Sequence, residues 1–167
     1  MTYTNTEACE ICEIIPKIPG SLIIDQDEFW VANLAFQDQS SLGRTYIALK
    51  RHAAELDELT EQEEASLLTM RNGIIRAIRE QFHPITFNIS CLKNDAFKQS
   101  PDTNPASAAH VHWHIVPRYN SEPTAFAGVT FQDPSPGRYL ALERTRKPVS
   151  EELAAKITTT IRDRYLK

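Results

Sequence analysis

Three histidines at alternate positions are the residues of this chain whose types and spacing best suit chemistry. His110, His112 and His114 are three of the five histidines in 167 residues, and they stand in the segment His-Val-His-Trp-His-Ile-Val. Side chains alternate across a β-strand, so the three imidazoles are expected on one face and the apolar residues between them on the other. A polar strand face needs no histidine for solubility. The pattern therefore predicts chemistry that imidazole supplies near neutral pH.

Two kinds of chemistry fit such a row of histidines. A metal ion bound by all three is disfavoured, because a rise of about 3.3 Å per residue puts the Cα atoms of His110 and His114 roughly 13 Å apart. Two of the three can still bind one ion, but no obvious carboxylate ligand lies nearby in the sequence. The other interpretation makes His112 a nucleophile that attacks phosphorus and forms a covalent nucleotidyl-histidine, while its neighbours bind the charged oxygens. We favour the second interpretation.

The segment resembles the signature of the histidine triad (HIT) superfamily, in which three histidines alternate with apolar residues and two apolar residues follow. Positions 110 to 116 match this signature in full. Individually weaker matches are Pro117-Arg118 after the triad, Gly43 before a strand that ends at Lys50-Arg51-His52, and the pair Cys9-x-x-Cys12. The resemblance covers residues 9 to 120, and the seven-residue pattern is its specific part.

The resemblance implies a small antiparallel sheet with helices, usually in a homodimer, that cleaves a nucleoside monophosphate from a second group. The substrate expected is a dinucleoside polyphosphate or a nucleotide phosphoramidate, with AMP as the nucleotide. His112 matches the nucleophile of the family, and His110 and His114 match the flanking catalytic positions. The mechanism needs no magnesium ion, since imidazoles and backbone N–H groups stabilise the phosphoryl charge. The alternative function is a nucleotide-binding regulatory module with little turnover.

Three further polar residues match substrate-binding positions of the family. Asn33 resembles the residue that binds the ribose hydroxyls, and Asn88 and Ser107 resemble positions near the phosphates. Asparagine and serine are also common at strand edges and in loops for structural reasons, so that reading stays open for each of the three.

Some members of the superfamily hold structural zinc through residues that match Cys9, Cys12, His52 and His110. Two thiolates and two imidazoles are a sound tetrahedral ligand set for zinc. We therefore expect one zinc ion that ties the N-terminal segment to the sheet. The alternatives for the cysteine pair are two ordinary thiols or a redox motif, although no βαβ pattern follows it.

Two features depart from the family pattern. Pro105-Ala106 stand where a Gly-Gln pair often precedes the triad, so the contact of that glutamine to the phosphate or leaving group is missing. The stretch from Asn88 to His110 is also longer than usual, which predicts an inserted loop over residues 94–105 beside the site. Neither feature alters His112, but with them the sequence does not determine which leaving group is displaced or which acceptor takes the nucleotide.

The elements that must position these residues are short strands and two helices. The helices are predicted from a capping box at Thr60 and Glu63 to about Gln81, before Pro84, and again after Ser150 to about residue 165. Strands outnumber helices and short turns separate the early ones, so we expect an α+β fold with an antiparallel sheet of about five strands. The strand-like runs are Ser21–Asp25, Phe29–Ala35, Thr45–Leu49, Thr86–Cys91 and His110–Pro117.

Composition indicates one globular domain over residues 1–167, with a core at about 9–120 and a C-terminal extension at 121–167. Hydrophobic residues make up 41% and charged residues 24% of the chain, and no apolar run approaches the ~20 residues of a membrane span. The net charge of −4 argues against binding of long nucleic acids. The first residues lack the pattern of a signal peptide, so a cytoplasmic location is expected. The open edges of a short sheet favour a homodimer.

Overall fold

An antiparallel sheet of five strands organises the fold. The computed structural model describes residues 9–92, 109–138 and 146–165. The strands follow the order β1-β2-β3-β5-β4, which puts β5 next to the edge strand β4. Their bounds are β1 Ile23–Gln26, β2 Trp30–Leu34, β3 Thr45–Leu49, β4 Thr86–Ser90 and β5 His112–Arg118. The predicted α+β class and the five-stranded antiparallel sheet are confirmed.

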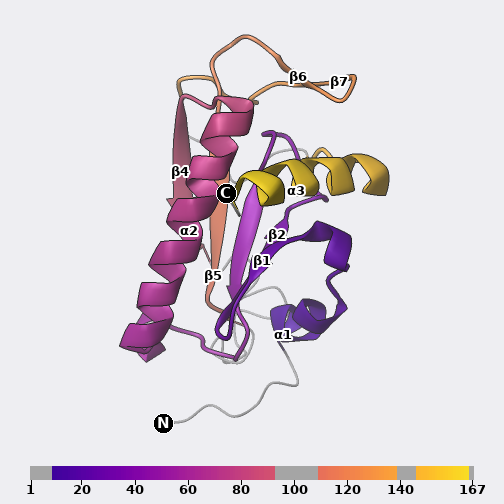
Figure 1. The fold of residues 1–167 in the computed structure, drawn as a ribbon. Coiled ribbons are helices and arrows are strands. Elements are labelled where there is room, and N and C mark those ends of the chain that lie inside the picture. Colours follow the sequence, from indigo (N-terminus) through magenta and orange to yellow (C-terminus); the bar gives the residue numbers. More distant parts are fainter. Residues whose placement is uncertain (1–8, 93–108, 139–145, 166–167) are drawn as a thin grey trace, which may run out of the picture.

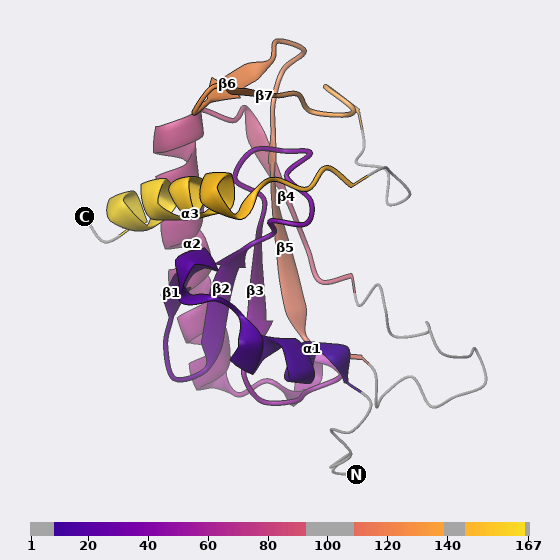
Figure 2. The ribbon, with the colours of Figure 1, turned by 90° about the vertical axis from the view of Figure 1, so that its right-hand side faces the viewer.

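Within the described residues three helices accompany the sheet, and the long one runs along one of its faces (Figure 1). They are α1 Glu10–Ile14, α2 Glu61–Phe82 and α3 Glu151–Tyr165. Short 3₁₀ turns occur at Ile15–Lys17, Gly20–Leu22 and Leu56–Glu58. Figure 2 shows α1 beside the start of β5, at the opposite end of the sheet from the hairpin of β6 (Thr124–Phe126) and β7 (Val129–Phe131). None of the helices in the described ranges is long and apolar enough to cross a bilayer.

The helix α2 begins and ends where its sequence signals predict. The hydroxyl of Thr60 accepts a hydrogen bond from the backbone N–H of Glu63, and the Glu63 carboxylate accepts one from the N–H of Thr60 at 2.8 Å. The helix ends at Phe82. Its C-cap residue, His83, adopts a left-handed conformation with φ of 52° and directly precedes Pro84. Its apolar stripe is buried against the sheet, and residues of the helix and the strands form one hydrophobic core.

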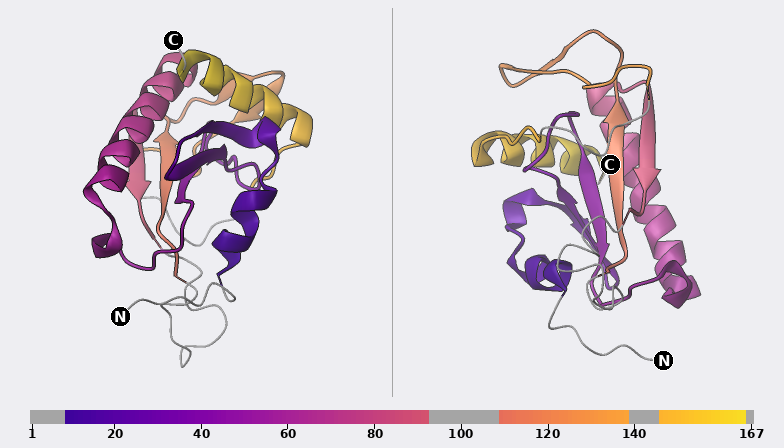
Figure 3. Two further views of the ribbon diagram at one scale, coloured as in Figure 1. Left: turned by 60° about the horizontal axis from the view of Figure 1, so that its bottom comes forward. Right: turned by 180° about the vertical axis from the view of Figure 1, so that it is seen from behind.

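The C-terminal helix α3 belongs to the main core, because five of its residues are buried there or beside it. Its bounds agree with the predicted second helix. It packs across α2 and against β1 and β2, as the views in Figure 3 show. The buried residues are Leu153, Ala154, Ile157, Thr158 and Ile161.

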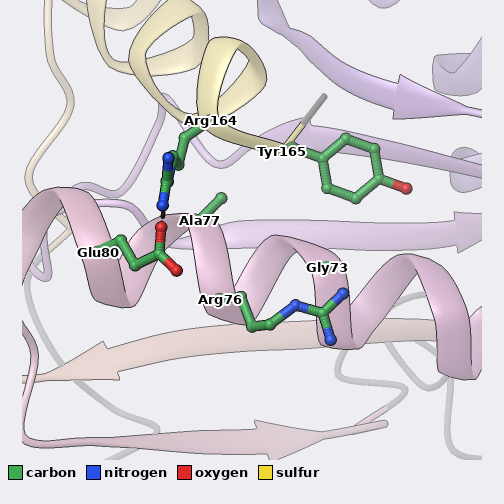
Figure 4. A pocket seen from close by; sticks show the side chains of 6 residues that line it. All are labelled: Gly73, Arg76, Ala77, Glu80, Arg164 and Tyr165. Atoms are coloured by element: carbon green, nitrogen blue, oxygen red, sulfur yellow. Dashed lines mark hydrogen bonds and ion pairs between the residues drawn. The ribbon is translucent and has the colours of Figure 1, made fainter. Parts of the chain in front are cut away.

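A close approach at Gly73 lets the end of α3 lie against α2. A Cβ atom at this position would stand 2.9 Å from Cδ2 of Tyr165, so a larger residue would collide with the ring. Figure 4 shows Tyr165 and Arg164 above α2, with Arg164 paired to Glu80. The Tyr165 hydroxyl donates to the carboxylate of Asp25 at 2.5 Å and thereby links α3 to β1.

Two predicted strands begin two residues later than expected, and one hairpin was missed. Residues 21 and 22 belong to a 3₁₀ turn, in which the N–H of Leu22 donates to the carbonyl of Pro19, so β1 starts at Ile23. The strand β5 starts at His112, since the N–H of Val111 bonds to Ala53 after β3 has ended. The missed hairpin pairs Thr124–Phe126 with Val129–Phe131. The predicted inserted loop at 94–105 lies outside the described residues.

Candidate active site

The strand β5 carries His112 and His114 on one face and core residues on the other. His112 lies opposite Ala48 of β3, and His114 lies opposite Tyr46. Ile115, on the core face of the strand, is fully buried. His110 precedes the strand, so the three histidines do not form one regular row, and its side chain has separate partners.

The ring of His112 is oriented by a backbone carbonyl. Its Nδ1 atom lies 2.8 Å from the carbonyl oxygen of His110. A carbonyl only accepts, so the ring proton lies on Nδ1 and the lone pair lies on Nε2. The Nε2 atoms of His114 and His112 are 3.1 Å apart, and the centroids of the two rings are 5.0 Å apart. The arrangement leaves the nitrogen that a nucleophile needs on the side of the ring facing His114.

His114 is buried between polar and aromatic neighbours that sequence analysis missed. Its Nδ1 atom lies 3.4 Å from Nη2 of Arg44, and Tyr46 contacts its ring edge-to-face at 5.0 Å between centroids. Arg44 forms a buried ion pair with Asp38. Burial alone would raise the pKa of Asp38, but hydrogen bonds from Ser40 and the charge of Arg44 hold it below its usual value. The only sign of these neighbours in the sequence was the position of Arg44, a charged residue directly before the largely buried strand β3.

A cavity of about 400 Å³ opens beside His112. Isoleucines from α1 and the segment after it, with Phe36, form an apolar wall, and Asn33 and Gln37 add polar groups. Such a mixture suits a ligand with a flat apolar part and a polar part. The lining residues are Glu10, Ile11, Ile14, Ile15, Ile18, Asn33, Leu34, Ala35, Phe36, Gln37, Tyr46, Ala48, His112 and Arg146.

The three predicted substrate-binding residues have different surroundings. Asn33 lines the cavity together with His112, and its side-chain amide donates to the carbonyl of Leu34 at 3.2 Å. Asn88 does not line the cavity; its side-chain oxygen accepts a hydrogen bond of 2.6 Å from Arg118, which is itself paired with Asp133. Ser107 lies outside the described residues.

Four predicted ligands come together at the start of β5 and can hold a metal ion. One ligand atom from each of Cys9, Cys12, His52 and His110 lies within 4.8 Å of the others. The Sγ–Nδ1 distances are 3.3 Å for Cys9 and His110, 3.4 Å for Cys12 and His110, and 3.5 Å for Cys12 and His52. Ligands at about 2.3 and 2.1 Å from a tetrahedral zinc ion are about 3.6 Å apart, so the donor set fits.

The chemistry of the donors also fits a cation. Burial, with the neighbouring Cys9, raises the pKa of Cys12 to about 12, so a thiolate here needs a positive charge beside it. Burial also lowers the pKa of His110 to about 4, which keeps the ring neutral. Its Nε2–H donates to the carbonyl of Leu49 at 2.8 Å and leaves the Nδ1 lone pair toward the cysteines.

This cluster is the only group of three or more such side chains that can hold a metal ion within the ranges the structure describes. Neither His112 nor His114 belongs to it. The interpretation of the triad as a metal site formed by two of its histidines is therefore disfavoured by the geometry as well as by the sequence.

Comparison with known proteins connects this site to a family. The profile of the HIT domain matches residues 16–121. Protein hit of Bacillus subtilis is 33% identical over 116 residues, which cover 68% of this chain and 72% of that protein. Adenosine 5'-monophosphoramidase of Schizosaccharomyces pombe is 29% identical over 153 residues, covering 90% and 98%. A Zn-bound histidine triad family protein of Mycobacterium smegmatis superposes with a TM-score of 0.61 at 22% identity, covering 96% and 95%.

Proposed function

Because this chain belongs to the HIT domain family, we propose that it is a nucleotide hydrolase or transferase that works through a covalent nucleotidyl-histidine on His112. The observation that carries the proposal is the contact between the His110 carbonyl and Nδ1 of His112. It puts the lone pair of the ring on the second nitrogen, Nε2, which is the atom that would attack phosphorus. The runner-up, a regulatory module, needs no such arrangement.

The reaction has two displacements at one phosphorus atom. In the first, Nε2 of His112 forms a bond to phosphorus while the bond from phosphorus to the leaving group breaks, and an amine leaving group takes up a proton from the solvent. In the second, water attacks the same phosphorus and gives up a proton to the solvent. The P–N bond breaks with its electron pair returning to Nε2, and the nucleoside monophosphate leaves. A transferase would use phosphate or another acceptor in place of water. His114 contacts a phosphate oxygen or the bridging atom in both steps.

The substrate that the cavity supports best is a nucleotide whose base lies against the apolar wall. Asn33 is then within the cavity as the ribose contact, and Asn88 and Ser107 are proposed for the phosphates. The name of the fission yeast relative supports AMP as the nucleotide and a phosphoramidate as one substrate. A dinucleoside polyphosphate is the other, since its α-phosphorus offers the same point of attack.

We assign zinc to the cluster of Cys9, Cys12, His52 and His110. The ion would act as a rigid cross-link between α1 and the start of β5, because four protein ligands leave no open coordination position for a substrate. The ion would take no part in the catalytic steps, which belong to His112 and His114.

The experiment that tests the proposal is capture of the intermediate. The protein is mixed with adenosine phosphoramidate or diadenosine tetraphosphate, quenched without acid, digested and analysed by mass spectrometry. Adenylate attached to His112 is the expected result. Adenylate on another residue overturns the assignment of the nucleophile. Tight binding of both compounds, measured by calorimetry, without turnover would favour the regulatory module.

A further inference from the structure

Arg44 is a buried arginine whose two terminal nitrogens have different partners. It stands directly before β3, and its side chain is 7% exposed. Nη1 pairs with the carboxylate of Asp38, and Nη2 lies 3.4 Å from Nδ1 of His114. The planar guanidinium holds both contacts in one geometry, which a single ammonium group does not.

The Asp38 side is fixed from several directions. The backbone N–H of Ser40 donates to Asp38 at 3.1 Å, and the N–H of Lys147 lies 3.5 Å from the same oxygen. The guanidinium carbon of Arg44 also lies 5.7 Å from the ring centroid of Tyr46, whose ring meets His114 edge-to-face. The arginine thus has little freedom to turn away from His114.

The contact determines which nitrogen of His114 carries the proton. A guanidinium only donates hydrogen bonds, so Nδ1 of His114 accepts and the ring proton lies on Nε2. That Nε2 atom is 3.1 Å from Nε2 of His112. In the other tautomer, Nδ1–H would face the donor Nη2, and two lone pairs would face each other between the two histidines.

We propose that Arg44, held by Asp38, is a positioning residue that keeps His114 as the Nε2–H tautomer beside the attacking nitrogen of His112. The proposal rests on the proposed function for its catalytic meaning. When phosphorus takes the lone pair of His112, the N–H of His114 turns from that lone pair to a phosphoryl oxygen and donates a hydrogen bond there. The proton stays on His114 throughout.

A second buried arginine–aspartate pair offers a matched control. Arg118, on the same strand as His114, pairs with Asp133 at 2.6 Å and is likewise buried. Among the described residues its side chain also donates to Asn88 and to the carbonyls of Ser135 and Arg138, and none of these partners is a histidine. Loss of Arg118 therefore costs a comparable ion pair without a direct effect on the His114 ring.

The test compares Arg44→Met with Arg118→Met. Long-range ¹H–¹⁵N correlation of the histidine rings reports which nitrogen of His114 holds the proton, and turnover of adenosine phosphoramidate gives kcat and KM. We expect Arg44→Met to lose the pure Nε2–H signature and to lower kcat by about 10- to 100-fold, as outer partners of functional histidines typically do, with KM little changed. Arg118→Met should keep the signature of the parent protein. If Arg44→Met does not fold, Arg44→Lys keeps a cation beside Asp38 and should show the same two losses.

The outcomes separate the two proposals. A folded Arg44 variant with the His114 tautomer and the kcat of the parent overturns the positioning role, whatever the reaction. The same tautomer change in Arg118→Met also overturns it, because the effect would then follow from general loss of stability. A parent protein that turns over neither adenosine compound defeats the proposed function, while the NMR comparison still decides the role of Arg44.

Discussion

The side chain of His110 faces the metal cluster while its carbonyl oxygen lies 2.8 Å from Nδ1 of His112. One residue thus joins a group of four side chains that can hold a metal ion to the ring we assign as nucleophile. Its second ring nitrogen bonds to Leu49 at the end of β3. A rigid His110 would therefore have two roles, as a metal ligand through its side chain and as the hydrogen-bond acceptor that orients His112 through its carbonyl.

Removal of the metal should weaken both the fold and the reaction. We expect about one zinc ion per chain by elemental analysis of protein purified without chelator, since a closed site with four ligands binds a single ion. Cys12→Ala should lose the ion and lower the melting temperature. It should reduce kcat less than loss of His112, because the carbonyl of His110 remains. Cys91→Ala is the control and should keep its zinc. Metal-free protein with unchanged melting temperature would contradict the assignment.

The pH dependence of stability should show the ion pair between Arg51 and Glu63. Hydrogen bonds from Arg51 lower the pKa of Glu63 to about 2, outweighing its burial. Because this value lies below the unfolded one of about 4.5, the stabilisation is complete above pH 4.5 and is lost as the pH falls toward 2. Glu63→Gln should therefore be less stable at pH 7 by about 1–2 kcal/mol in urea unfolding. A deficit that stays constant down to pH 2.5 would refute this origin.

Much of the fold follows from local signals in the sequence. Thr60, Glu63 and Pro84 define α2 because capping and the missing N–H of proline act within one helical turn. The run Thr45–Leu49 agrees with β3 at both ends. The hairpin of β6 and β7 was missed because its turn places Ala127 and Gly128 at positive φ, whereas Asn-Gly or Asp-Gly is the usual signal.

The site could be predicted only where the type and spacing of the residues themselves indicate a particular chemistry. The triad histidines stood out by type and spacing, and the family resemblance pointed to Cys9, Cys12, His52 and His110, which the structure brings together. Arg44 and Asp38 were not, because their meaning depends on a contact between Arg44 and His114 across 70 positions. The start of β5 at His112 rather than His110 has the same origin, since Val111 bonds to Ala53 and His110 contacts a cysteine of a distant segment.

The contact between Gly73 and Tyr165 can be tested by a pair of substitutions. Alanine in place of a helical glycine normally stabilises a helix by about 1 kcal/mol. Gly73→Ala should instead destabilise this protein, because the new Cβ would collide with the Tyr165 ring. In a Tyr165→Ala background the same change should become stabilising. Equal effects of Gly73→Ala in the two backgrounds, measured by urea unfolding, would show that the ring is not the cause.

A homodimer remains our expectation, and the edge strand β4 is where a partner is most easily placed. Edge strands present backbone groups that can pair with another chain. Ile89 of β4 is 36% exposed and Leu68 of α2 is 50% exposed. Light scattering at micromolar concentration should give twice the chain mass. Ile89→Lys should shift the population toward monomer, while Leu68→Lys should not. A monomer mass for the parent protein would end this expectation.

Two substitutions in the triad should have clearly unequal effects. His112→Ala removes the atom that bonds to phosphorus, so labelling by an adenylyl donor and turnover should both vanish. His114→Ala removes a stabilising N–H but leaves the nucleophile, so turnover should fall by about 10²–10³ while labelling persists more slowly. The label should be labile in acid and stable in base, as expected of a phosphoramidate. Both variants are compared by circular dichroism to exclude unfolding. If His112→Ala keeps turnover near that of the parent, His112 is not the nucleophile, because the variant lacks the nitrogen that the mechanism bonds to phosphorus.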